Sequence, residues 1–131
     1  MRTRESEEMY LETILLLKQK SANVHSVDVV GELNYAKSSV SRGMNLLVKN
    51  GYITMDRVTG VIEFTEKGRA KAQNIYERHR VLTKVLEKIG ASAEMADENA
   101  CRIETVMSYK MLHVITKFVT EGYFVYNKLL S

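Results

Sequence analysis

The stretch that decides the fold is KSSVSRGMNLLVKNGYITMDRVTGVIEFT, residues 37–65. Its first part carries an apolar stripe at the i, i+4, i+7 spacing of one helical face: Val40, Met44 and Leu47. The Asn-Gly pair at 50–51 favours the end of that helix, because both residues tolerate left-handed backbone angles. Two short runs rich in β-branched and aromatic residues follow, separated by the Thr-Gly pair at 59–60. This change of period predicts a helix followed by a β-hairpin.

Helical patterns flank this stretch on both sides. Upstream, residues 6–20 and 26–33 carry apolar residues at helical spacing, with Ser26 as the expected N-cap of the second helix. Downstream, residues 65–90 predict a long amphipathic helix and residues 92–131 predict two or three more. The expected order is therefore helix, helix, turn, helix, hairpin and further helices.

This order predicts a mainly α fold with a small β-hairpin. A helix–turn–helix followed by a two-stranded ribbon is the winged-helix arrangement, which we expect over residues 1–72. The helices of residues 73–131 have no part in that module. Dimerisation is the role that we expect for them, so the second predicted domain is a C-terminal helical dimerisation domain.

Composition narrows the class of protein. The 131 residues include one cysteine and no proline, and the net charge is only +3. No apolar run approaches the ~20 residues needed to span a bilayer, and the start MRTRESEEMYLETILLL is too acidic before its apolar part for a secretory signal. One cysteine without a disulfide framework fits a reducing interior. We expect a cytoplasmic protein with no membrane partner.

The helix predicted at 37–49 has the side chains of a DNA-reading element. It is cationic and contains no acid; its small hydroxyls allow close approach to phosphates, and its Arg and Asn can reach base edges. An Arg beside the hairpin turn is placed to contact the neighbouring DNA backbone. The predicted DNA-binding residues are Lys37, Ser38, Ser39, Ser41, Arg42, Asn45 and Arg57. The alternative is a solvated amphipathic helix whose cationic face serves solubility.

Five potential metal ligands fall on three separate predicted helices: Met9, Glu12, His79, Cys101 and Glu104. The first two and the last two are i, i+3 pairs, so each pair shares a helix face. Thioether, thiolate, imidazole and carboxylate all suit a borderline divalent transition metal. The alternative is that the methionine and the cysteine are core residues and the histidine a surface residue. Spacing alone leaves both interpretations open.

A family resemblance bears on this choice. The segments EMYLETI (residues 8–14) and NACRIETVMS (residues 99–108) resemble segments of the metal-dependent repressors typified by the diphtheria toxin repressor and the manganese transport regulator. SSVSRGMNLLVKNGYI, FTEKGRAKA and RHRVL fall between them in the order and spacing of that family. The resemblance extends to about residue 120. It implies that metal binds near the first helix and the dimerisation helices, and that the metal-loaded dimer binds operator DNA.

The resemblance also implies roles for single residues. Met9, Cys101 and Glu104 match ligands of the diphtheria-type primary site. Glu12 and His79 match ligand positions of the manganese-regulator type, and the histidine also matches a ligand of the diphtheria-type second site.

The sequence departs from the family pattern at several places. Thr105 stands where the family has histidine directly after the last glutamate, and a hydroxyl is a poor substitute for imidazole. The position four after His79 is Thr83 rather than a carboxylate, and the upstream histidine position is Asp97. Because the sequence stops at Ser131, we expect the SH3-like domain of longer members to be absent.

Two interpretations of the site follow. In the first, the site is retained but altered, and His79 replaces the missing histidine in the five-residue set. The soft donors of this set favour iron, cobalt or zinc over manganese. In the second, the site is degenerate and no metal is bound.

The sequence therefore predicts a metal-responsive DNA-binding transcriptional regulator, a repressor of metal-homeostasis genes that binds double-stranded operator DNA as a homodimer. One alternative is a winged-helix regulator that responds to no metal or to another signal, such as oxidation of Cys101. Another is a structural dimer whose winged helix binds protein. We do not expect an enzyme, because no convincing nucleophile–base pair or Gly-rich phosphate loop is present.

Overall fold

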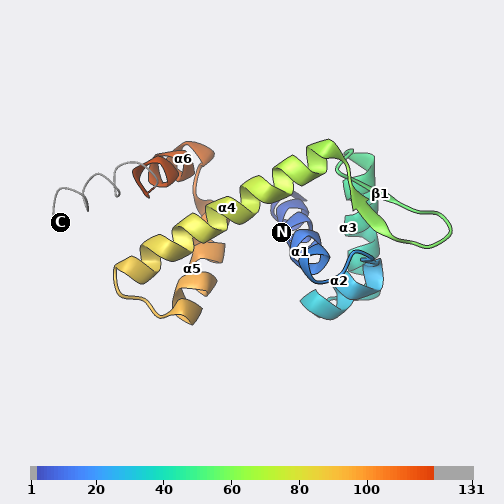
Figure 1. Ribbon diagram of the computed structural model, residues 1–131, viewed down its shortest axis with the longest axis horizontal. Coiled ribbons are helices and arrows are strands. Elements are labelled where there is room, and N and C mark those ends of the chain that lie inside the picture. The colour runs from blue at the N-terminus through green and yellow to red at the C-terminus, as the bar shows by residue number, and fades with distance from the viewer. Residues whose placement is uncertain (1–2, 120–131) are drawn as a thin grey trace. The chain divides into compact units, whose positions relative to one another are not determined.

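The structure, a computed structural model, describes residues 3–119, apart from the side chains of residues 3–6 and of Thr105 (Figure 1). Its N-terminal elements are α1 (Thr3–Lys20), α2 (Ser26–Leu33), α3 (Lys37–Lys49), β1 (Ile53–Met55) and β2 (Ile62–Phe64). Its remaining elements are α4 (Glu66–Lys88), α5 (Ala93–Val106) and α6 (Tyr109–Lys117). The mainly α fold with a two-stranded hairpin is therefore confirmed. The last part of the predicted C-terminal helices, residues 120–131, lies outside the described residues.

The chain divides into two units, the first ending at Ile75 and the second beginning at Tyr76. The division falls inside α4, so this helix contributes residues to both units. The boundary predicted at 72/73 also lies within α4.

The first unit has the helix–turn–helix that the sequence predicts. Asn34 ends α2 with a φ of 58°, a left-handed conformation that Asn adopts more readily than most residues. Its backbone N–H donates to the carbonyl of Val30 over 2.8 Å. The expected N-cap of α2 is wrong by one residue, because His25 occupies that position and Ser26 is already helical. The Asp28 carboxylate accepts from the backbone N–H of His25 over 2.8 Å, which stabilises this earlier start.

The core of the first unit joins α1, α2, α3 and the hairpin. In α3, the predicted apolar stripe is buried, and α1 and α2 pack against this helix. The chain before α2 also reaches the hairpin, since the N–H of Ile62 donates to the carbonyl of Val24 over 2.8 Å. The largest of its fully buried side chains are Leu11, Ile14, Val24, Val29, Val40, Met44, Leu47, Ile53 and Ile62.

The hairpin is antiparallel, and Ile53 pairs with Phe64. Its strands are shorter than the sequence runs suggest. The carboxylate of Asp56 accepts from the backbone N–H groups of Val58 and Thr59, both over 2.8 Å, and these bonds fix the turn at the tip. The backbone N–H of Asp56 still donates to the carbonyl of Val61 over 3.0 Å, so the turn lies between these two residues.

In the second unit, serine side chains begin both helices after α4. Ser92 accepts from the N–H of Met95 at the start of α5, and Ser108 accepts from the N–H of Met111 at the start of α6, each over 3.2 Å. The core of this unit contains Leu82, Ala100 and Leu112 with Leu86, Ile103, Met107 and Ile115 against it. Among the described residues, no helix is both long enough and apolar enough to cross a membrane.

Gly68 is required by the close approach of α4 to the base of the hairpin. A Cβ at this position would lie 1.8 Å from the carbonyl oxygen of Tyr52. We predict that Gly68→Ala lowers the free energy of unfolding by about 2 kcal/mol, because backbone must move. Gly31→Ala is the matched control: no described heavy atom lies within 4 Å of its Cβ, and alanine in this helix should add about 0.5–1 kcal/mol. Urea unfolding followed by circular dichroism measures both; equal stabilities would contradict the prediction.

Candidate functional site

The structure places the predicted DNA-reading residues of α3 on its solvent side. The buried stripe of Val40, Met44 and Leu47 faces the core, which fixes the rotation of the helix. Ser39 is half-buried, and the other residues of the set are exposed: Lys37, Ser38, Ser41, Arg42 and Asn45. One helix therefore presents hydroxyl, amide and cationic groups together, as a major-groove element requires. Their contact with DNA remains a prediction.

Tyr10 of α1 packs against α3 at Gly43. Its ring lies so close to Gly43 that a Cβ there would be 2.2 Å from Cε2, and its hydroxyl donates to the carbonyl of Ser39 over 3.3 Å. Burial, with a smaller contribution from Tyr35, raises the pKa of Tyr10, while nearby Arg42 acts in the opposite direction. The phenol therefore remains a neutral hydrogen-bond donor. Sequence reasoning missed this residue, because an aromatic side chain on an apolar helix face gives no local sign of its partner.

The hairpin carries Arg57 at its tip. Arg57 is exposed, and the side chain of the adjacent Val58 is 94% exposed. The turn behind them is held by Asp56, whose pKa is lowered by backbone hydrogen bonds from Thr59 and then Val58. Because this carboxylate stays ionised, the tip keeps one defined shape from which the Arg57 guanidinium extends.

In the second unit, His79 of α4 lies between two carboxylates of α5. Its Nδ1 is 3.4 Å from Oε2 of Glu104, and its Nε2 is 2.6 Å from Oδ1 of Asp97. The side chains of His79 and Glu104 are only 15% and 13% exposed, whereas that of Asp97 is 71% exposed. The structure therefore brings together two of the five predicted ligands and adds one acidic neighbour.

The other three predicted ligands have different surroundings. Cys101 is exposed on α5, one turn before Glu104. Met9 and Glu12 are half-buried on α1, in the first unit. The sulfur of Met9 accepts a hydrogen bond from the hydroxyl of Tyr35 over 3.3 Å. Thr105 is helical, but its side chain is outside the described part of the structure.

The chemistry of the His79–Glu104 pair fits a divalent cation. Within the described part of the chain, Oε1 of Glu104 is buried and has no hydrogen-bond partner, an arrangement that favours a cation beside it. The described residues nevertheless contain no group of three or more His, Cys, Asp or Glu that could hold a metal ion. One physical reason is that Asp97 and Glu104 approach opposite ring nitrogens and do not converge on one point. The pair could thus supply two of the ligands of a metal ion.

Comparison with known proteins decides the family. Residues 2–61 match the domain described as "Iron dependent repressor, N-terminal DNA binding domain", and residues 65–122 match "Iron dependent repressor, metal binding and dimerisation domain". The chain belongs to the iron-dependent repressor family. It is therefore a transcriptional regulator of a metal-dependent family, with a DNA-binding and a dimerisation domain, and not an enzyme. The predicted resemblance to this family is confirmed.

Individual relatives differ in how much of them the chain covers. It is 30% identical over 117 residues to an uncharacterized HTH-type transcriptional regulator, MJ0568, of Methanocaldococcus jannaschii, covering 88% of this chain and 93% of that one. It is 34% identical over 104 residues to the iron-dependent repressor IdeR of Mycobacterium tuberculosis, covering 77% of this chain but 44% of that one. The crystal structure of T. acidophilum IdeR matches with a TM-score of 0.71 at 26% identity, covering 84% of this chain and 52% of that one.

The Glu104 carboxylate, whose side chain is only 13% exposed, offers a direct test of metal binding by this chain. We predict that Glu104→Gln weakens Co(II) binding at least tenfold, about 1.4 kcal/mol, because a charged donor becomes neutral. Glu98→Gln is the matched control on the same helix, since Glu98 is exposed and paired with Arg102. Spectroscopic titration of the chelated, reduced protein measures both affinities. If the two variants bind Co(II) equally well, Glu104 is not a ligand.

Proposed function

We propose that this chain is a metal-responsive repressor that binds operator DNA as a homodimer and controls metal-homeostasis genes. The observation that carries the proposal is the partly buried His79–Glu104 pair, which lies in the part of the chain matched to a metal-binding and dimerisation domain. The exposed polar face of α3, in the part matched to a DNA-binding domain, supports the second half of it.

The DNA-binding step assigns a role to each group of exposed residues. The α3 helix would lie in the major groove, with Arg42 and Asn45 at base edges and Lys37 and the serines of α3 at phosphates. Arg57 of the hairpin would contact the neighbouring backbone. Two copies would place their α3 helices about one DNA turn apart on an approximately palindromic operator.

The metal-binding step begins from the His79–Glu104 pair. Glu104 and Nδ1 of His79 would hold the ion, while Asp97 on the other ring nitrogen would orient the imidazole. Met9, Glu12 and Cys101 are the remaining predicted ligands, and their sulfur atoms favour iron, cobalt or zinc over manganese. A bound ion would supply the difference in affinity that favours the DNA-binding arrangement.

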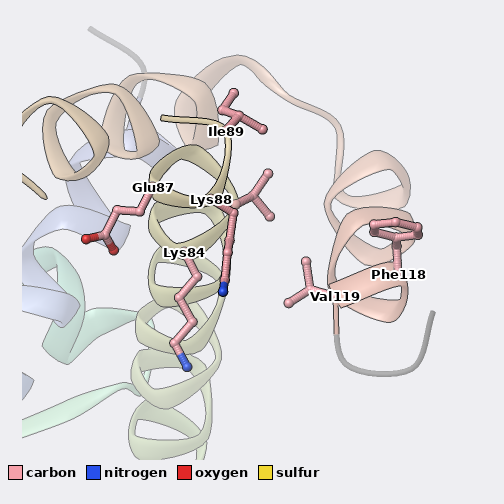
Figure 2. Close-up of a pocket in the computed structure, with 7 residues that line it drawn as sticks. Lys84, Glu87, Lys88, Ile89, Phe118 and Val119 are labelled. Atoms are coloured by element: carbon pink, nitrogen blue, oxygen red, sulfur yellow. The ribbon is translucent and has the colours of Figure 1, made fainter. Parts of the chain in front are cut away.

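The dimer follows from apolar surface on the second unit. Figure 2 shows a groove between the C-terminal end of α4 and the residues just after α6. Ile89 and Phe118 line it, and their side chains remain 77% and 60% exposed in the single chain. A second copy would cover such surface, since exposed apolar patches mark association sites.

A regulator that reads operator DNA and has no membrane partner would act in the cytoplasm.

A second candidate function is a regulator of the same fold with a degenerate metal site. The described residues contain no group of three or more potential ligands, and Thr105 replaces a family histidine. Such a protein would bind operator DNA equally well with and without metal. Comparing operator affinity in chelator and in excess Fe(II) separates the two functions.

We predict that Arg42→Ala raises the Kd for operator DNA at least tenfold, because a bidentate arginine–guanine contact contributes about 1–3 kcal/mol. Arg80→Ala is the matched control: it removes the same charge from an exposed arginine of α4 that pairs with Glu77. The operator is obtained by selection from random duplexes, and fluorescence anisotropy gives the Kd. Equal affinities of the two variants would mean that α3 is not the recognition helix.

We predict that Phe118→Asp shifts the protein from dimer to monomer, because a carboxylate would be buried against apolar surface without a partner. Lys110→Gln on the exposed side of α6 lowers the net charge by the same one unit and serves as the control. Sedimentation equilibrium gives the dissociation constant of the dimer for each variant. A dimer unaffected by Phe118→Asp would exclude this groove from the interface.

A further inference from the structure

A buried carboxylate on α1 contacts two other elements of the first unit. The side chain of Glu7 is 10% exposed. Its Oε2 accepts from the side-chain amide of Asn50 over 2.5 Å, and its Oε1 accepts from Nζ of Lys71 over 3.3 Å. Asn50 is the C-cap of α3, and Lys71 belongs to α4.

The same network continues to the base of the hairpin. Nζ of Lys71 donates to the hydroxyl of Tyr52 over 3.1 Å and lies 4.7 Å from the centre of its ring. Nζ of Lys67 lies over the same ring at 4.6 Å and donates to the carbonyl of Asn50 over 3.0 Å. Tyr52 directly precedes β1. Glu7 thus connects α1 with the end of α3, the base of the hairpin and the start of α4.

The charges of this network are set by their surroundings. Burial alone would lower the pKa of Lys71, but hydrogen bonds to Tyr52 and Glu7 outweigh it, so that the pKa is raised above its ordinary value. Lys71 therefore remains charged and its ion pair with Glu7 persists. Ion pairs shielded from water are seldom more stabilising than apolar residues of the same size, and the presence of this partly buried pair is consistent with a geometric role.

We propose that Glu7 is a positioning residue for DNA reading. Through Asn50 it holds the end of α3, and through Lys71 and Tyr52 it holds the base of the hairpin, so that both elements meet the DNA in one fixed relation. This inference rests on the proposed function, in which α3 and the hairpin contact the same operator.

The test compares Glu7→Gln with Glu77→Gln, which removes the same charge from an exposed glutamate of α4. Each variant is titrated with the selected operator and with an unrelated duplex of the same length, below its unfolding temperature. Loss of positioning raises the Kd for the operator about tenfold and the Kd for unrelated DNA less than twofold, because only specific binding needs both elements aligned. A structural role alone lowers both affinities together through the folded fraction.

Asn50→Ala provides a second variant where Glu7→Gln does not fold. It removes the bond to the end of α3 and leaves the ion pair with Lys71, and it raises the operator Kd several-fold under the proposal. An unchanged ratio of operator to unrelated-DNA affinity in either folded variant overturns the proposal. Arg42→Ala in the same assay distinguishes failure of the Glu7 proposal from failure of the proposed DNA-reading function. If Arg42→Ala also leaves operator affinity unchanged, the proposed DNA-reading function is wrong. If Arg42→Ala weakens operator binding while the Glu7 variant does not, only the positioning role of Glu7 is wrong.

Discussion

Burial of the apolar stripe of α3 is the constraint on which the first unit depends. Val40, Met44 and Leu47 can leave water only by packing toward α1 and α2, and this sets the rotation of α3 about its own axis. The hydroxyl, amide and guanidinium groups of the helix then face solvent as a consequence. Tyr10 also limits the distance between α1 and α3, since its ring occupies the space that a side chain at Gly43 would need. Core packing therefore decides which side of α3 faces solvent.

The second unit shows the same dependence of a polar site on apolar packing. Leu82, Ala100 and Leu112 hold α4, α5 and α6 together, and that packing brings His79 against Glu104. A histidine and a carboxylate held in partial burial are costly unless a partner or an ion satisfies them. The same packing leaves other apolar side chains exposed around the groove of Figure 2, as expected for a dimerisation domain.

Local signals in the sequence predicted the helices and strands well at positions where only one favourable interaction is available. The Asn-Gly pair at 50–51 ends α3, and the apolar stripe of Val40, Met44 and Leu47 is buried as its spacing predicts. The signals failed where two groups compete. Ser26 is a good N-cap, but the Asp28 carboxylate stabilises a start one residue earlier. The hairpin runs are rich in strand-forming residues, but the Asp56 carboxylate binds the N–H groups of Val58 and Thr59, and a turn begins soon after β1.

The sequence by itself determined the winged-helix order, the family and the identities of the candidate residues. Helical period, turn chemistry and motif spacing all depend on residues that are close together along the chain. Only the tertiary structure decided which of those residues meet. Glu7 and Lys71 are far apart in the chain, as are His79 and Glu104, and no local pattern marks either pair. Such pairs form because apolar faces elsewhere on their helices pack together, and the polar groups that come into contact must then be satisfied.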